Sequence, residues 1–124
     1  MKKSITLLLT VAIIVVGTST ASAHTVLIAS NPAKGSIIKV LPAKITLKFA
    51  DPLLTLGKRV INMVIVTGPT SKVVTTGKDT VKGAVLTDSM ITTHAAIGIY
   101  KVSYRVSAQD GHIVTGSFTF TLLN

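Results

Sequence analysis

The chain has 124 residues, of which 48% are apolar and 14% are charged, so it is long enough for one domain with a core and too short for two. Cysteine is absent, which excludes a disulfide scaffold, a thiolate zinc site and a cysteine nucleophile. Thirteen Lys and Arg against four Asp and Glu give a net charge of +9. This charge would suit an anionic surface such as lipid headgroups or wall polymers, but the basic residues are scattered, so we interpret it as an aid to solubility. Without a basic stripe and stacking aromatics, we expect no nucleic-acid partner.

Residues 1–23 have the three parts of a secretory signal peptide. Two lysines follow the first Met, an apolar run covers 5–16, and Ala21-Ser22-Ala23 gives the small-x-small pattern of a cleavage site. The apolar run is shorter than the roughly 20 residues that span a bilayer, which favours cleavage over a retained anchor. We therefore expect a signal peptide over 1–23, a mature domain over 24–124, and export to the periplasm, cell envelope or extracellular space. Loss of the two lysines lowers the net charge to +7.

After residue 23, apolar and polar residues alternate at the two-residue period of a half-buried strand. The predicted strands cover 25–29, 45–49, 60–67, 84–89, 100–106 and 118–122, with 73–74 as a weaker candidate. The run over 60–67 is almost continuously apolar, which predicts a strand covered on both faces. Turn residues such as Gly68-Pro69 and Asp110-Gly111 separate the strands, and no segment has a capped helical period. We predict an all-β fold, an immunoglobulin-like Greek-key β-sandwich of about seven strands.

His24 is the most informative residue for function. Cleavage after Ala23 would leave His24 with both a free α-amine and an imidazole, which together form a two-nitrogen chelate at the end of the first strand. The amine can lose its proton to a metal near neutral pH. The alternative is that His24 is an arbitrary first residue at a permissive cleavage site.

Asp110-Gly111-His112 is the second candidate. On an extended segment, residues i and i+2 point to the same face, so Asp110 and His112 can present an oxygen and a nitrogen together. Gly111 permits a bend and keeps the approach free of a side chain. The alternative is a plain Asp-Gly turn with a solvated His112. Together with His24, these groups form an N3O set that suits Cu(II), although zinc can use the same ligands.

Few other residues can carry chemistry. The remaining aspartates are Asp51, Asp79 and Asp88, glutamate is absent, and His94 has no partner in the sequence, which indicates a solvated loop histidine. Met63 and Met90 are too few thioethers for Cu(I), so we expect no dedicated Cu(I) site. No nucleophile elbow, phosphate loop or dinucleotide fingerprint occurs, so no motif predicts an enzyme.

Over its whole mature length the chain resembles the CopC family of periplasmic copper-resistance and copper-binding proteins. The matching segments are Ala21-Ser22-Ala23-His24, Ser30-Asn31-Pro32-Ala33-Lys34-Gly35-Ser36, Leu41-Pro42, Ile45-Thr46-Leu47-Lys48-Phe49-Ala50-Asp51-Pro52, and the segment from Gly98 through Asp110-Gly111-His112 to Gly116-Ser117-Phe118-Thr119-Phe120. The last segment is the most specific, because it ends in the Asp-Gly-His motif.

This resemblance implies a seven-stranded sandwich that holds one Cu(II) at its end. His24 would supply its amine and imidazole, Asp110 a carboxylate oxygen and His112 an imidazole. Asp51 falls where the family often has an acid in a Phe-Ser-Glu-Pro segment, which implies a supporting position that orients a ligand. A turn residue before Pro52 is the alternative. The resemblance also implies a membrane copper transporter as the partner, here on a separate chain.

We therefore predict a non-catalytic, monomeric Cu(II) carrier or buffer in copper homeostasis or resistance. One alternative is an enzyme, because an N-terminal histidine with a second histidine also forms the copper brace of polysaccharide monooxygenases. The aromatic residues lie on the apolar phase of their strands, which leaves none for a sugar-binding platform. The other alternative is a structural sandwich module that has no metal dependence.

Overall fold

The computed structural model of this protein describes residues 24–124. The predicted signal peptide over 1–23 lies outside the described residues. Eight strands form within the described range: β1 (Leu27–Asn31), β2 (Ile37–Ile38), β3 (Lys44–Phe49), β4 (Met63–Thr67), β5 (Thr80–Lys82), β6 (Val85–Ser89), β7 (Gly98–Ser107) and β8 (Ile113–Leu122). From residue 24 onward, the chain contains no helix with the length and apolar character needed to cross a membrane.

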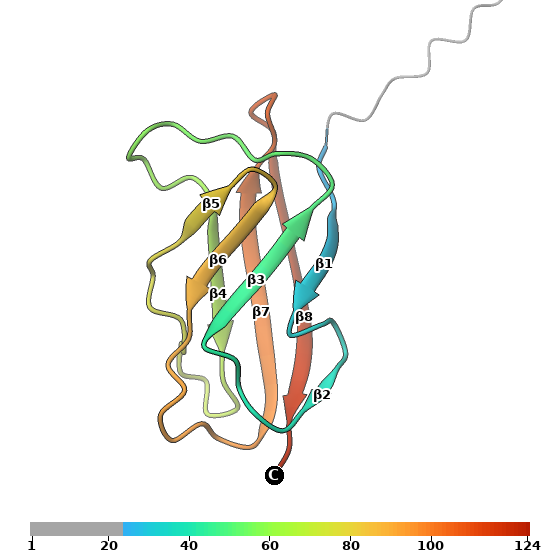
Figure 1. The fold of residues 1–124 in the computed structure, drawn as a ribbon, viewed down its shortest axis with the longest axis vertical. Helices are drawn as coiled ribbons and strands as arrows, with labels where there is room; N and C mark the ends of the chain where they lie inside the picture. Colours follow the sequence, from blue (N-terminus) through green and yellow to red (C-terminus); the bar gives the residue numbers. More distant parts are fainter. Residues whose placement is uncertain (1–23) are drawn as a thin grey trace, which may run out of the picture.

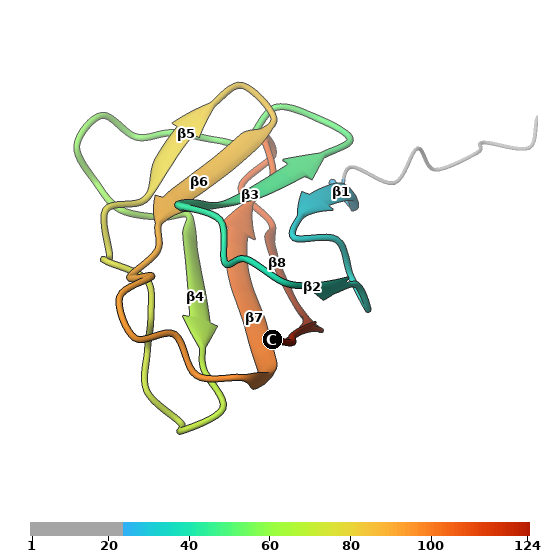
Figure 2. The ribbon, with the colours of Figure 1, turned by 60° about the horizontal axis from the view of Figure 1, so that its bottom comes forward.

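The strands form two four-stranded sheets, in the orders β1-β3-β6-β5 and β2-β8-β7-β4. The sheets pack face to face as a sandwich (Figures 1 and 2). Every pairing is antiparallel except the short parallel one between β2 and β8. The longest ladder joins β7 to β8 from Gly98↔Leu122 to Ser107↔Ile113. The predicted all-β sandwich is confirmed.

The core lies between the sheets and follows the alternation in the sequence. On β3, Ile45, Leu47 and Phe49 are buried, while Lys44 and Lys48 are exposed. The facing sheet contributes buried side chains from β4, β7 and β8, namely Val64, Val66, Tyr100, Val102, Val106, Phe118, Phe120 and Leu122. We expect this apolar core to form without a ligand, because burial of apolar area is the main driving force for folding.

The structure differs from the predicted strands in three respects. The weaker candidate at 73–74 forms no strand, and Val73 makes only an isolated bridge to Thr67. The run over 60–67 becomes a strand only from Met63, and its cover is one-sided: Val64 and Val66 are buried, whereas Ile65 is 37% exposed and Val60 is 70% exposed. The prediction of two-sided cover is wrong because a two-layer sandwich leaves each strand with one outer face. Strands β2 and β5 were not predicted, because two or three residues are too few to show a period.

Candidate metal centre

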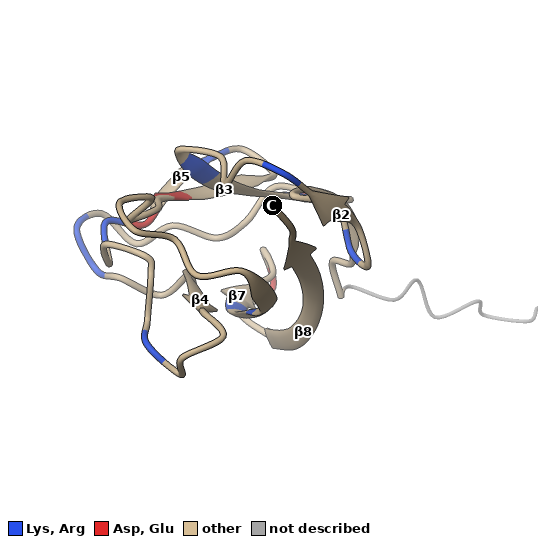
Figure 3. Cartoon of the chain, turned by 90° about the horizontal axis from the view of Figure 1, so that it is seen from below, with Lys and Arg blue, Asp and Glu red and all other residues tan. Residues whose placement is uncertain are grey.

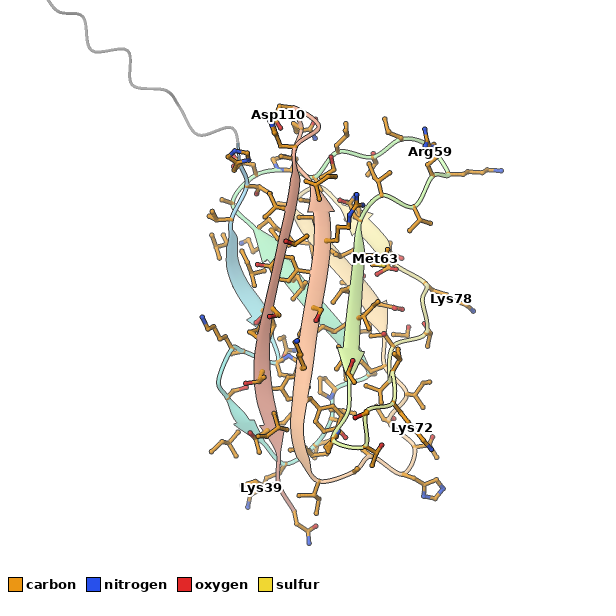
Figure 4. The ribbon with its side chains drawn as sticks, turned by 180° about the vertical axis from the view of Figure 1, so that it is seen from behind. Lys39, Arg59, Met63, Lys72, Lys78 and Asp110 are labelled. Carbon is orange, nitrogen blue, oxygen red and sulfur yellow. The ribbon has the colours of Figure 1, made fainter. Side chains whose placement is uncertain are left out.

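The candidate site lies at one end of the sandwich and takes residues from both sheets. His24 lies three residues before the start of β1, and residues 108–112 connect β7 to β8. Figure 4 shows Asp110 at the tip of this connection, at the same end of the molecule as the start of the described chain. Because β1 and β8 belong to different sheets, the site bridges the two layers.

A tight turn positions Asp110 and His112. The Gly111 amide donates to the Ala108 carbonyl at 2.9 Å, and the Ala108 amide donates to the His112 carbonyl at 2.8 Å. Gly111 has a φ of 88°, in the left-handed region that glycine adopts at no steric cost. The Asp-Gly turn expected from the sequence is therefore present, and it folds the two side chains toward each other.

His24 is placed by the residue that follows it. Thr25 is 1% exposed, and its hydroxyl accepts a hydrogen bond from the Asp51 amide at 3.2 Å. The Ala50 amide also donates to the Val26 carbonyl at 2.8 Å, which fixes the start of the chain against the loop after β3. Thr25 could not be identified from the sequence, because a threonine at the beginning of the predicted strand over 25–29 gives no functional signal.

The two imidazole rings meet at this end. The centroids of the His24 and His112 rings are 4.9 Å apart, and the rings meet edge to face at 73°. His112 is mostly exposed. The fold therefore brings two imidazoles from different sheets side by side, and imidazole is the commonest metal-ligating side chain.

Asp110 is held by His112 through both of its oxygens. The His112 backbone amide donates to Oδ1 at 3.0 Å, and Nδ1 of the ring lies 2.6 Å from Oδ2. The hydrogen bond from the His112 amide, the bond from its ring and the nearby charges of His112 and His24 lower the pKa of Asp110. Since an ionised carboxylate only accepts, Nδ1 carries a proton in this contact, and in the neutral ring Nε2 is then the nitrogen with a lone pair for a metal. This is the usual pairing of a metal-binding histidine with a carboxylate.

His24, Asp110 and His112 thus lie close together, but their side chains are not arranged as a complete set of metal ligands. Within residues 24–124, no group of three or more His, Cys, Asp or Glu is placed so that it could hold a metal ion. Both oxygens of Asp110 are hydrogen-bonded to His112, so either oxygen would have to exchange that bond to become a metal ligand.

Asp51 and His94 lie outside this group. The backbone of Asp51 is hydrogen-bonded to the Thr25 hydroxyl, beside His24. The Asp51 carboxylate forms no hydrogen bond with any of the described residues. Its supporting role stays a prediction.

His94 lies in the connection from β6 to β7, at the opposite end of β7, where it is exposed and lines a hollow of about 430 Å³.

The comparisons with known proteins agree with this architecture. The model of the CopC domain matches residues 27–123. The chain belongs to the CopC domain family. It is 36% identical over 105 residues to copper resistance protein C of Pseudomonas syringae pv. tomato, with 81% of each chain covered. The resemblance inferred from the sequence is confirmed.

Two crystal structures show the shared fold. CopC from Methylosinus trichosporium OB3b has a TM-score of 0.67 and 24% identity, with 80% of this chain and 93% of that chain covered. PcoC, a methionine rich copper resistance protein from Escherichia coli, has a TM-score of 0.63 and 24% identity, with 81% of this chain and 99% of that chain covered.

Proposed function

We propose that this member of the CopC family is an exported, non-catalytic Cu(II)-binding protein that carries or buffers one copper ion in copper homeostasis or resistance. The observation that carries the proposal is the 4.9 Å approach of the His24 and His112 rings from two different sheets, with Asp110 bonded to His112. The name of the relative from Pseudomonas syringae pv. tomato supports copper as the cargo.

The proposed ligands are three nitrogens and one oxygen. Signal-peptide cleavage after Ala23 gives His24 a free amine beside its imidazole, and His112 offers Nε2. Asp110 is anionic at neutral pH, since its pKa is lowered below the ordinary value of 3.8, so it supplies negative charge to a cation without first losing a proton. One of its oxygens becomes a ligand when the carboxylate turns from the His112 ring toward the metal. Nitrogen and oxygen ligands in a tetragonal arrangement are those that Cu(II) prefers.

A carrier fits this chain better than a copper enzyme. A polysaccharide monooxygenase needs an open metal face and a flat aromatic surface for its polymer. In residues 24–124 the three phenylalanines and Tyr100 are buried, and Tyr104 is half-buried with its ring against Phe49. No aromatic ring is therefore left to stack on a sugar. We also propose that the protein is a monomer that exchanges copper with a separate membrane transporter.

The test uses protein that begins at His24, with its N-terminus verified by mass spectrometry. Titration against a competing chelator should give one Cu(II) per chain, and electron paramagnetic resonance should show a tetragonal type 2 signal. Zinc that binds as tightly as copper would contradict the metal assignment, given the affinity order of these metals. Absence of any metal binding would indicate the structural module, and turnover of ascorbate and oxygen on a polysaccharide would indicate the enzyme.

A further inference from the structure

From residue 24 onward, the Lys and Arg side chains form no ion pair with an acidic residue. Of the thirteen Lys and Arg, eleven follow residue 23, and the same part of the chain contains only four aspartates. Among the described residues the ion pairs within 4.0 Å comprise only His112 with Asp110, so no Lys or Arg is paired. Asp88 is buried, and Asp79 accepts a hydrogen bond from the Val64 amide. The positive surface charge is therefore uncompensated by the protein itself.

Strand pairing gathers three of these lysines on the outer face of the β1-β3-β6-β5 sheet. Lys48 of β3 and Lys82 of β5 both pair with Val85 of β6, from opposite sides. With strands about 4.8 Å apart, their Cα atoms are separated by about 10 Å. Lys44 lies four residues from Lys48 on the same face, which is about 13 Å along the strand.

A hollow lies between two of these lysines. Lys44, Lys82, Thr80, Thr87 and Val85 line a space of about 250 Å³ on this face. Two ammonium groups and two hydroxyls supply donors, and no carboxylate lines the space. Figure 3 shows blue Lys or Arg segments in the layer that contains β3 and β5. Donors and positive charge without a competing acid are the requirements of a phosphate group.

We propose that this hollow, with Lys48 beside it, is a binding site for anionic phosphate groups presented at more than one point, as in anionic lipid headgroups or phosphate polymers. The three lysines are too far apart to bind one small anion together, but their spacing allows each to contact a different anion of an array. The sequence suggested that the charge serves only solubility, because lysines at 44, 48 and 82 look scattered until β3, β6 and β5 pair. The proposal does not depend on copper, since none of these residues lies in the candidate metal centre.

The test uses metal-free protein of residues 24–124, which contains both sheets and the whole apolar core and so can fold as a unit. Cosedimentation is measured with phosphatidylcholine vesicles with and without phosphatidylglycerol. We expect binding only to the anionic vesicles, weakening as salt screens the charges. The double variant Lys44→Gln/Lys82→Gln should lose about 10-fold or more in affinity, since each lysine near an anionic surface contributes substantially.

The matched control is Lys39→Gln/Lys101→Gln, which removes the same charge from two exposed lysines elsewhere. It should lose less than about 3-fold, since distant exposed charges are screened. Inorganic polyphosphate is the second probe. If it binds with the same dependence on Lys44 and Lys82, the site recognises phosphate from either source, and if only vesicles bind, the source is the lipid. Equal losses in the two double variants, or no binding of either probe at low salt, would overturn the proposal. Copper affinity measured on the same variants should be unchanged.

Discussion

Asp88 and Asp110 each have both carboxylate oxygens hydrogen-bonded, yet they lie in opposite surroundings. Asp88 is 2% exposed and accepts from the hydroxyl of Thr76 and from the amides of Gly77, Lys78 and Ser89. Asp110 is exposed, and both of its hydrogen bonds come from His112.

The difference lies in what the donors can do. Three of the four donors to Asp88 are backbone amides, so the carboxylate joins β6 to the segment before β5 and can leave only if that segment unfolds. One donor to Asp110 is an exposed ring that also faces His24, so the carboxylate can exchange a hydrogen bond for a metal. The first carboxylate holds the fold, and the second is available for chemistry.

Asp88→Ala should have the largest effect. It leaves three amides and one hydroxyl without their acceptor, so the free energy of unfolding should fall by about 2 to 4 kcal/mol. Urea unfolding of the metal-free protein measures this change. Copper affinity below the unfolding transition should stay within about 2-fold of the wild type, because the site is remote. Asp51→Ala, which removes a carboxylate without hydrogen bonds, is the control and should cost under about 0.5 kcal/mol.

His112→Ala should have the second-largest effect, which is on Cu(II) affinity and not on the free energy of unfolding. It removes a proposed ligand and the ring that holds Asp110, so Cu(II) affinity should fall by about 100-fold, since losing even a supporting partner costs 10- to 100-fold. His94→Ala is the matched control, because His94 is exposed at the other end of β7. Chelator competition on both variants checks the prediction, and equal losses would contradict the site.

One added Gly before His24 should have a somewhat smaller effect. It converts the amine into an amide, which donates a lone pair only after losing a proton, and the two-nitrogen chelate is lost. We expect a folded protein with an altered resonance spectrum and about 30-fold weaker Cu(II) binding, within the range for loss of one group at a metal site. Indistinguishable affinities of the two forms at pH 7 would show that the amine is not a ligand.

Asp110→Asn sharpens the comparison with Asp88. The amide keeps the shape but removes the anionic oxygen, so Cu(II) affinity should fall by about 10-fold. The unfolding midpoint of the metal-free protein should hardly move, because the site is exposed. A large loss of stability would instead place Asp110 in the same class as Asp88.

Asp79→Asn should give the smallest effect, and its sign depends on pH. Burial, followed by the charge of Asp88, raises the pKa of Asp79 above its ordinary value of 3.8. A raised pKa means that the stability contribution is present below pH 3.8 and is lost as pH rises through the folded-state value. Asn keeps the acceptor for the Val64 amide without the charge, so the variant should be slightly more stable at pH 7 and equal to wild type in acid. Asp79→Ala, which loses the acceptor, should be less stable at both pH values.

Much of the fold could be predicted because its longer strands alternate. The segments over 45–49 and 100–106 lie within β3 and β7, and the Asp-Gly turn lies where expected. Strands β2 and β5 could not be predicted, because pairing with β8 and β6 rather than their own sequence makes them strands.

The candidate site could be predicted only in part. The sequence predicted Asp110 beside His112 from the geometry of an extended segment, whereas a tight turn brings the two side chains together. Only the packing of two sheets brings His24 to them. Composition alone does not distinguish the buried Asp88 from the other three aspartates. One signal was available for Asp88: it lies two residues from Leu86 on the inward phase of an alternating segment, where an acid must find donors.

The bridging of the two layers by the candidate site has a mechanical consequence. β1 is an edge strand, and it joins its sheet through β3 alone. An ion bound by both His24 and His112 would cross-link this edge strand to the opposite sheet, so β1 could not separate from β3 without releasing the ion. Copper loading should therefore slow hydrogen exchange at the Ala50 amide, which bonds to Val26, more than in the β4–β7 ladder. Loosening of that edge would in turn offer a route for giving up the ion.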